Sequence, residues 1–424
     1  MTLNYINIRN GQLMIGQFTA QQLAQRFNTP LYVMDEKLIR QQAQMFKHSF
    51  THPQLTSEVI YASKAFLTLA MCKLIQEEGL SLDVVSGGEL YTAHQAGFEM
   101  SRVYFHGNNK SLSELKMAVD VGVSTIVLDN EDELDLLLPL LKHSQKVLLR
   151  VNPGIEAHTH EYIATTKNDS KFGLSTADPA TLLLIDRLII EPKIDFAGLH
   201  AHIGSQIFEA ESFFKEADAL IQFIADNKLP VKELNLGGGF GVAYTLDDNP
   251  LSLPEFLHSL LEHIYKTLTA VGLDTMKIMI EPGRSIVANA GTTLYTIGST
   301  KTTINHKNYV FVDGSMADHI RTALYGAQYT AILANRADEF CDIPYTVTGK
   351  ACESGDIIIK EVLLPECKKG DILAVCSTGA YHYTMSSNYN RLPRPAVIFV
   401  SEDQVRIAVR RETYEDLIRN DVGV

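Results

Sequence analysis

Residues 58–84 read EVIYASKAFLTLAMCKLIQEEGLSLDV, and this stretch decides the fold that the sequence predicts. It opens with an apolar run at 58–61 that contains β-branched side chains, and it closes with a second such run at 81–84. Between them, residues 65–78 have the length and the mixed composition of an amphipathic helix. A strand, a helix and a second strand in this order predict a parallel βαβ unit.

The same alternation of short apolar runs and longer amphipathic segments, such as 209–227, extends over much of the chain. The candidate strands are 30–34, 58–61, 81–84, 102–105, 124–127, 146–149, 194–197, 233–236 and 277–280. Eight strands close a β/α barrel, so the ninth would be an accessory strand. The sequence therefore predicts an α/β fold with a (β/α)8 TIM-like barrel over residues 29–284.

After about residue 285 the pattern changes to strands without regular intervening helices. The candidate strands are 292–297, 309–312, 356–359, 371–375 and 396–400, and the strand-like segments 5–8 and 13–15 open the chain. A chain of 424 residues is also long for one hydrophobic core. We therefore expect a second, β-rich domain made of residues 1–28 and 285–424.

The composition limits the classes of partner. A formal net charge of −13 argues against binding nucleic acid or an anionic membrane, because both would repel the chain. No apolar run approaches the roughly 20 residues that span a bilayer, and no leader peptide is visible. The five cysteines form no CxxC pair, which favours reduced thiols. We expect a cytoplasmic protein that acts on a small molecule.

Polar residues follow the predicted strands at the point where each strand ends. In a β/α barrel these ends form one face, which carries the active site. The residues are Lys64, Asp83, His106, Asn152, His200, His202, Gly237 to Gly239 and Glu281. Several strand ends that deliver reactive groups to one rim are a more specific signal than any one of these residues alone.

Lys64 has two interpretations. In isolation it is most simply a surface lysine at the start of a helix. Its neighbours are an apolar strand and Ala65, Phe66 and Leu67, where a charged amine is costly without a partner or a function. Imine chemistry needs an amine that can be neutral, and burial lowers the pKa of a lysine. This context favours a covalent cofactor site.

Two turns indicate how a cofactor could be held. The glycines of 236–241 (LGGGFG) can direct backbone N–H groups at a phosphate, although a dinucleotide-binding turn or a turn without a ligand remains open. The sequence Glu281-Pro-Gly-Arg284 directly follows a strand. A carboxylate there can keep a pyridinium nitrogen protonated, and an arginine can bind a phosphate or carboxylate by two bonds.

A metal site is the alternative. His200 and His202 lie on the same face of a strand, as in metal-dependent barrel hydrolases, and His158 and His160 form a second such pair. That alternative gives no role to Lys64, to the glycine run or to Arg284. We therefore expect no metal.

Taken together and in order, the motifs resemble those of the diaminopimelate decarboxylases, which belong to the pyridoxal-phosphate (PLP) decarboxylases with an alanine-racemase-like barrel of fold type III. The resemblance covers essentially the whole chain. It rests on Tyr61-Ala-Ser-Lys64, Asp83-Val-Val-Ser-Gly-Gly-Glu89, His106-Gly-Asn-Asn-Lys110, Lys171-Phe-Gly173, His200-Ala-His-Ile-Gly-Ser205, GGGFG, EPGR, Cys352-Glu-Ser-Gly-Asp356, Gly379-Ala-Tyr381 and Met385-Ser-Ser-Asn-Tyr-Asn390.

The resemblance implies how PLP is bound. Lys64 would hold it as an imine, His202 would stack on its ring, and Glu281 would pair with the ring nitrogen. Asp83 would also belong to the cofactor site. The residues implied to hold the phosphate and its surroundings are Ser205, Gly239, Gly283, Arg284 and Tyr381.

The resemblance also implies a substrate site and a homodimer. The implied substrate-binding residues are Arg284, Arg321, Tyr325, Glu353 and Tyr381. Glu353 would bind the distal ammonium group of the substrate. Cys352 would donate a proton to the product carbon from across the dimer interface. The catalytic residues would be Lys64, Cys352 and His202. A buried structural thiol is the simpler interpretation of Cys352.

The chain departs from the family near Arg321, since Thr322 replaces the usual proline and the following Gln328 and Tyr329 are less usual. The implied reaction converts meso-2,6-diaminopimelate to L-lysine and carbon dioxide, the last step of lysine biosynthesis. One alternative is a related decarboxylase of ornithine, arginine or carboxynorspermidine. Another is a non-catalytic PLP-binding homologue, which should lack Lys64 or Cys352.

Overall fold

The computed structural model describes residues 5–155 and 170–423. His158 and His160 lie outside this range. The contacts divide the chain into two compact units. The barrel unit comprises Gln42–Gly241 and Pro250–Ser285, and the β unit comprises Met1–Gln41, Val242–Asn249 and Ile286–Val424.

The barrel unit contains a closed barrel of eight parallel strands, as predicted. They are β5 (Ser57–Ala62), β6 (Ser81–Val84), β7 (Val103–Phe105), β8 (Thr125–Leu128), β9 (Gln145–Asn152), β11 (Ile194–His200), β12 (Glu233–Asn235) and β13 (Lys277–Ile280). Strand β13 pairs with β5, which closes the ring, and the short β10 (Leu174–Ser175) adds to β9.

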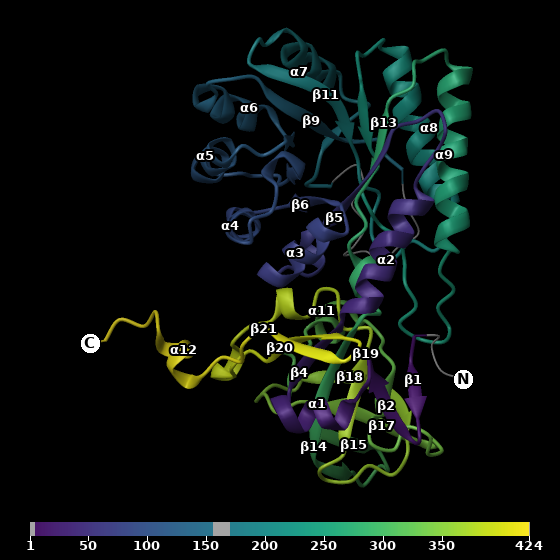
Figure 1. Ribbon diagram of the computed structural model, residues 1–424, viewed down its shortest axis with the longest axis vertical. Helices are drawn as coiled ribbons and strands as arrows, with labels where there is room; N and C mark the ends of the chain where they lie inside the picture. The colour runs from purple at the N-terminus through teal and green to yellow at the C-terminus, as the bar shows by residue number, and fades with distance from the viewer. Residues whose placement is uncertain (1–4, 156–169, 424) are drawn as a thin grey trace. The chain divides into compact units, whose positions relative to one another are not determined.

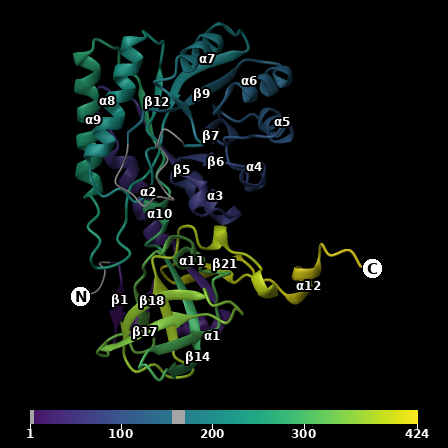
Figure 2. The same ribbon diagram turned by 180° about the vertical axis from the view of Figure 1, so that it is seen from behind.

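Helices cover the outside of this barrel (Figure 1). They are α3 (Leu69–Glu77), α4 (Gly87–Gln95), α5 (Leu112–Val121), α6 (Glu131–Leu137), α7 (Pro179–Ile190), α8 (Glu211–Asp226) and α9 (Leu253–Ala270), and α2 (Glu36–Ser49) enters the unit from the β unit. Five of these helices start at a side chain that accepts a backbone N–H, and the capping residues are Thr68, Ser86, Ser111, Asn130 and Asp178. Helices α8 and α9 lie side by side (Figure 2).

Apolar side chains fill the barrel. One buried cluster takes a residue from each of six strands: Ile60, Tyr104, Val127, Leu148, Ala197 and Met279. The interior is therefore a packed core and not a pore, which leaves the ends of the strands as the place for chemistry.

Glu216 is an exception in the hydrophobic face of α8. Its side chain is 0% exposed, and neither carboxylate oxygen has a hydrogen-bond partner in the described part of the chain. Burial raises its pKa well above the ordinary value. An acid whose pKa is raised on folding adds stability below its unfolded value, near pH 4.5, and this contribution is lost as the pH rises.

We therefore expect Glu216→Gln to stabilise the protein increasingly with pH. The difference in free energy of unfolding from wild type should grow by up to about 1.4 kcal/mol per pH unit above about pH 5, because the wild type must keep a proton that the unfolded chain releases. Urea unfolding at pH 5, 6, 7 and 8 measures it. A difference that stays constant with pH would contradict the expectation.

The β unit is built on the long strand β14 (Gly291–Thr302). It pairs with β4 (Leu31–Asp35), β15 (Asn308–Val312) and β19 (Ile372–Cys376). The other strands are β16 (Ala331–Leu333), β17 (Ile343–Thr348), β18 (Ile357–Leu364), β20 (Ala396–Ser401) and β21 (Gln404–Val409), with β1 (Asn7–Arg9), β2 (Gln12–Ile15) and β3 (Phe18–Thr19) in a separate sheet. The predicted β-rich second region is confirmed.

Short helices complete the chain. In the β unit, α1 (Ala20–Phe27) begins with a capping box in which Thr19 and Gln22 bond each other's backbone N–H. The remaining elements are α10 (Arg284–Val287), α11 (Arg321–Tyr325), α12 (Tyr414–Ile418), η1 (Ser63–Ala65), η2 (Met100–Arg102), η3 (Leu138–Leu140), η5 (Tyr383–Met385) and η6 (Tyr389–Arg391). None of the described helices combines the length and apolarity needed to cross a bilayer.

One strand lies elsewhere than the range 29–284 predicts. Strand β4 pairs with β14 and β20 in the β unit and with no barrel strand. It is the accessory ninth strand. The division in contacts accordingly falls after Gln41 and Ser285, with Val242–Asn249 grouped in the β unit. An apolar β-branched run predicts a strand but does not identify its sheet.

Candidate active site

Lys64 lies in the single turn η1, two residues after β5 ends. Its neighbour Ser63 donates a hydrogen bond of 2.9 Å to Glu89 Oε2, and Glu89 also accepts the backbone N–H of Val85 at 2.7 Å. Glu89 thus ties the loop that carries Lys64 to the loop after β6. The lysine is held at the strand-end rim, as the sequence predicted.

Glu281 follows β13 and is the most strongly bonded acid of the rim. Its Oε1 lies 2.9 Å from His106 Nε2 and accepts Asn235 Nδ2 at 2.8 Å, and its Oε2 lies 3.1 Å from His200 Nε2. Burial alone would raise the pKa of Glu281, but the two imidazoles hold it well below the ordinary value. Glu281 is therefore an anion inside the barrel.

Asp83, on β6, is a second buried acid of this rim. Burial raises its pKa to about 7, the charge of Glu281 adds to this, and His106 and Lys64 oppose it. Its side chain is 1% exposed, and Oδ1 has no hydrogen-bond partner within the described residues. Buried acceptors normally have a hydrogen-bond donor, and a bound ligand can supply one to this oxygen.

His202 contacts the glycine run at the same rim. Its Nδ1 accepts the backbone N–H of Gly238 at 3.2 Å, so a neutral ring carries its proton on Nε2. Burial lowers the pKa of His202 well below the ordinary value, and the charge of Lys64 lowers it further. The ring is therefore neutral and lies within electrostatic reach of Lys64.

The glycine run allows backbone to approach backbone at the rim. A Cβ on Gly238 would lie 2.3 Å from the carbonyl oxygen of Glu281, and one on Gly239, whose φ is +116°, would lie 2.8 Å from that of Gly204. A Cβ on Gly237 would lie 2.8 Å from His202 Cβ and 2.9 Å from its Nδ1. The run is therefore fixed by close packing, and it leaves a cradle without side chains at the end of β12.

Arg284 and Ser205 form a polar pair in the same unit. Arg284 donates from Nη2 to Ser205 Oγ at 2.9 Å, and from Nε at 3.3 Å. The guanidinium belongs to a residue that is 5% exposed. A buried cation beside a hydroxyl, close in sequence to Gly283, is suited to bind an anion such as a phosphate.

A second group of predicted residues gathers within the β unit around Arg321. Arg321 Nε donates to the hydroxyl of Tyr329 at 2.9 Å. Its guanidinium carbon lies 5.0 Å from the ring centroid of Tyr325 and 5.5 Å from that of Tyr381. The aromatic rings and the hydroxyl fix the direction of the buried guanidinium. Thr322 does not displace it.

Cys352 and Glu353 lie in an exposed turn of the β unit. The backbone N–H of Cys352 donates to Asn390 Oδ1 at 2.7 Å, and Glu353 Oε1 accepts Gly355 N at 3.2 Å. Exposure of Cys352 excludes the interpretation as a buried structural thiol, which fits Cys72, Cys367 and Cys376 instead.

The predicted residues thus fall into two groups. The barrel unit contains Lys64, Asp83, His202, Ser205, Gly239, Glu281, Gly283 and Arg284, and the β unit contains Arg321, Tyr325, Cys352, Glu353 and Tyr381. The contacts of His106, His200 and Asn235 with Glu281 were not foreseen. All three residues end or follow a barrel strand, and this was the signal available in the sequence.

The metal alternative depends on His200 and His202, but these two do not form a ligand group together. Among the described residues, the group of candidate ligands is His106, His200 and Glu281, whose donor atoms lie within 4.8 Å of one another. In this group His200 Nε2 is hydrogen-bonded to Glu281 Oε2 at 3.1 Å, and His106 Nε2 lies 2.9 Å from Glu281 Oε1.

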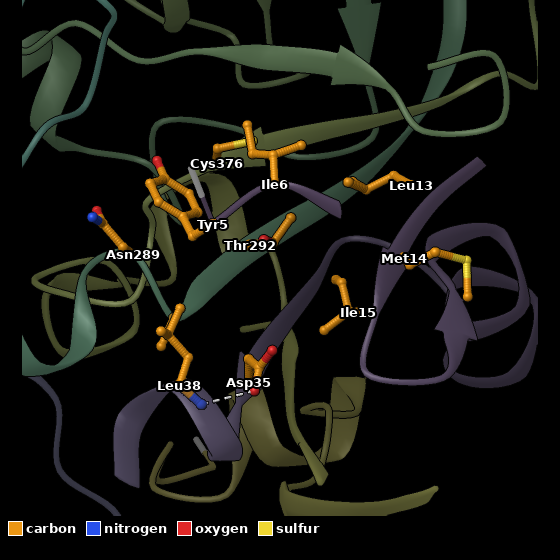
Figure 3. A pocket seen from close by; sticks show the side chains of 11 residues that line it. Tyr5, Ile6, Leu13, Met14, Ile15, Asp35, Leu38, Asn289, Thr292 and Cys376 are labelled. Carbon is orange, nitrogen blue, oxygen red and sulfur yellow. Dashed lines mark hydrogen bonds between the residues drawn. The ribbon is translucent and has the colours of Figure 1, made fainter. Parts of the chain in front are cut away.

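A pocket of the β unit is unrelated to these residues (Figure 3). Its volume is about 30 Å³, which has room for water but not for a cofactor. Asp35 at its wall accepts the backbone N–H of Leu38 at 3.0 Å (Figure 3). The lining residues are Tyr5, Ile6, Leu13, Met14, Ile15, Asp35, Leu38, Asn289, Ala290, Thr292 and Cys376.

Known proteins resemble the chain over nearly its full length. The family described as "Pyridoxal-dependent decarboxylase, pyridoxal binding domain" matches residues 36–288. Diaminopimelate decarboxylase of Bacillus subtilis (strain 168) is 49% identical over 421 residues, which cover 98% of this chain and 96% of that protein. The diaminopimelate decarboxylase of Halalkalibacterium halodurans is 45% identical over 419 residues, covering 97% and 95%.

Comparison of the fold with solved structures also finds diaminopimelate decarboxylases. The crystal structure of diaminopimelate decarboxylase from M. jannaschii in complex with L-lysine matches with a TM-score of 0.92 at 30% sequence identity. The match covers 99% of this chain and 98% of that chain. The likeness therefore extends over both the barrel unit and the β unit.

Proposed function

The chain belongs to the diaminopimelate decarboxylases, PLP-dependent lyases that convert meso-2,6-diaminopimelate to L-lysine and carbon dioxide, and on this premise we propose which of its residues perform the reaction. Lys64 holds the cofactor, and Glu281 faces its ring nitrogen. The observation that carries this proposal is the buried Glu281, which is hydrogen-bonded by His200 and Asn235 at the same rim as Lys64.

PLP, when bound, supplies an electron sink that accepts the electron pair left by the departing carboxylate. The contribution of Glu281 is electrostatic, because an anion at this place keeps a ring nitrogen protonated. The buried Asp83, with one unpartnered oxygen, provides an acceptor beside Lys64. These two acids and the amine fit the chemistry of the cofactor.

His202 and the glycine run would line the place of the cofactor. The imidazole of His202 is held by the backbone N–H of Gly238, and we assign it the role of stacking on the face of the cofactor ring. Ser205, Gly239, Gly283 and Arg284 bind the phosphate, together with Tyr381. The support for this assignment is the buried pair of Arg284 and Ser205 and the cradle that Gly239 leaves open.

The substrate has an amino-acid group at each end, and the chain has separate residues for each. Arg321 and Arg284 bind the carboxylate that is retained, with Tyr325 and Tyr381 beside Arg321. Glu353 binds the distal ammonium. A substrate with one amino-acid group, such as ornithine, lacks the group that these arginines bind, so release of carbon dioxide from each candidate amino acid tests this specificity.

Cys352 is the proton donor. Its thiol is in an exposed turn, where a residue can act on a site that a second chain supplies. We propose a homodimer in which Cys352 and Glu353 of one chain complete the site of Lys64 in the other. A cytoplasmic location is proposed as well, and five free cysteines within one chain support it.

Mixing two inactive variants tests the shared site. Lys64→Ala and Cys352→Ala subunits, combined at equal amounts and exchanged at random, should recover about a quarter of the wild-type activity, because half of the dimers are mixed and each has one intact site. The unmixed variants are the controls. No recovery after verified subunit exchange would indicate that each chain supplies both residues to its own site.

A further inference from the structure

Both oxygens of Glu281 are engaged by imidazoles. His106 Nε2 lies 2.9 Å from Oε1, and His200 Nε2 lies 3.1 Å from Oε2. We propose that His106 and His200 are positioning residues, which hold Glu281 as an anion that would pair with the ring nitrogen of the cofactor. This inference rests on the proposed role of Glu281.

The two histidines reach Glu281 from both sides of the barrel. His106 directly follows β7, where its backbone N–H bonds Val84 O at 2.8 Å. His200 is the last residue of β11 and is in register with Asn235 of β12. Their rings meet edge to face, with centroids 4.8 Å apart at 68°. Residues from separate strands therefore converge on one carboxylate.

The number of donors around Glu281 determines how many lone pairs of its carboxylate stay available to the cofactor. An ionised carboxylate offers about four lone-pair positions. His200 and Asn235 each form one hydrogen bond to it, and His106 Nε2 lies 2.9 Å from Oε1 without hydrogen-bond geometry. The backbone N–H of Glu281 fixes the residue on Gly237 O at 2.7 Å. The carboxylate therefore keeps lone pairs for a further donor. A protonated ring nitrogen is a donor of the right charge.

A neutral donor can bond Glu281 without neutralising its negative charge, whereas a cation would neutralise it. Burial lowers the pKa of His200 to about 4, against the opposing effect of Glu281, so the ring is neutral at pH 7 and donates its Nε2–H. Such a bond stabilises the carboxylate without cancelling its charge. Other charged groups whose fields reach this cluster are Lys64, Asp83, Glu89 and Arg150. Glu281 thus keeps its negative charge for the cofactor.

A purely structural role does not explain why a histidine is buried at position 200. Its Nδ1 is buried and has no hydrogen-bond partner among the residues that the structure describes. A buried polar atom without a partner costs about 1–3 kcal/mol, which an apolar side chain at this place would avoid. The ring therefore makes its one strong bond to Glu281 at the expense of stability, which is typical of functional positions.

The experiment measures binding to the apoprotein and needs no turnover. The probes are PLP and the analogue with CH in place of the ring nitrogen, titrated by absorbance. Wild type should prefer PLP. His200→Leu and His106→Leu should each reduce the ratio of the two affinities by about tenfold, the size expected for one bond to a charged group. His200→Gln, which retains an N–H donor, should recover most of it.

The matched control is His263→Leu. This histidine also bonds a carboxylate, Asp218 at 2.7 Å, but on helices α8 and α9 outside the barrel. Its affinity ratio should equal that of wild type. If the leucine variants do not fold, His200→Asn replaces them, because its shorter amide does not reach Glu281 and the same loss is expected.

The outcomes separate the two proposals. A wild-type affinity ratio in folded His106 and His200 variants would overturn the positioning role while leaving Glu281 in place. Equal affinity of wild type for both probes would overturn the role of Glu281 itself. The preference for PLP over the analogue could be lost in His200→Leu and not recovered in His200→Gln. That result would show that the ring acts by packing alone, and it would contradict the inference.

Discussion

Glu281→Gln should lower kcat by about 10²–10³-fold, the usual loss when one preorganised electrostatic group is removed. The reason is twofold. The amide has no charge to keep a ring nitrogen protonated, and its NH2 group would face donors such as those of His200 and Asn235, which the carboxylate now accepts. Steady-state lysine formation at saturating cofactor and substrate measures the effect.

Two further measurements make this result specific. Thermal unfolding of Glu281→Gln should show a folded protein, and borohydride should still label the cofactor-binding lysine. Glu133→Gln is the matched control, because Glu133 is a buried acid of the same unit that bonds Lys110 instead of His106 or His200. Wild-type kcat in a loaded Glu281→Gln variant would contradict the role of Glu281.

Cys352→Ala should lower kcat by about 10²–10⁴-fold, the range expected for loss of a general acid. The thiol is exposed and its backbone is fixed by Asn390, so the substitution removes a proton donor and little packing. The visible absorption spectrum of the bound cofactor should remain that of wild type. Lysine formation in single-turnover and steady-state assays measures the loss.

Cys341→Ala controls for the loss of an exposed thiol, since Cys341 is also exposed in the β unit and has no proposed role. Its activity should equal that of wild type. Unchanged turnover in Cys352→Ala would remove Cys352 from the reaction, and a different residue would then have to deliver the proton.

The barrel could be predicted from the sequence because its signal is local and repeated. Most of its strands are short apolar runs followed by an amphipathic segment of helix length, so each such βα unit predicts its own structure. The place of β4 could not be predicted in this way. Its partners β14 and β20 are distant in sequence, and pairing depends on contacts that periodicity does not encode.

The place of the candidate site could be predicted where chemistry and position agree. Lys64 and Glu281 were selected because each follows a strand and has a side chain with reactive or charged character, and their roles stay a prediction. Asn235 was missed, because an asparagine at the end of a strand is also common in a turn. Its function as a donor to Glu281 follows only from the 2.8 Å contact, which arises when two strand ends meet in space.

The most direct test of the central claim is to treat the protein, loaded with PLP, with borohydride and to map the labelled peptide. Reduction fixes the cofactor to whichever amine carries it. We expect one labelled peptide, with the modification on Lys64 at the end of β5. A label on another lysine, or a protein that stays colourless with the cofactor, would contradict the assignment of Lys64.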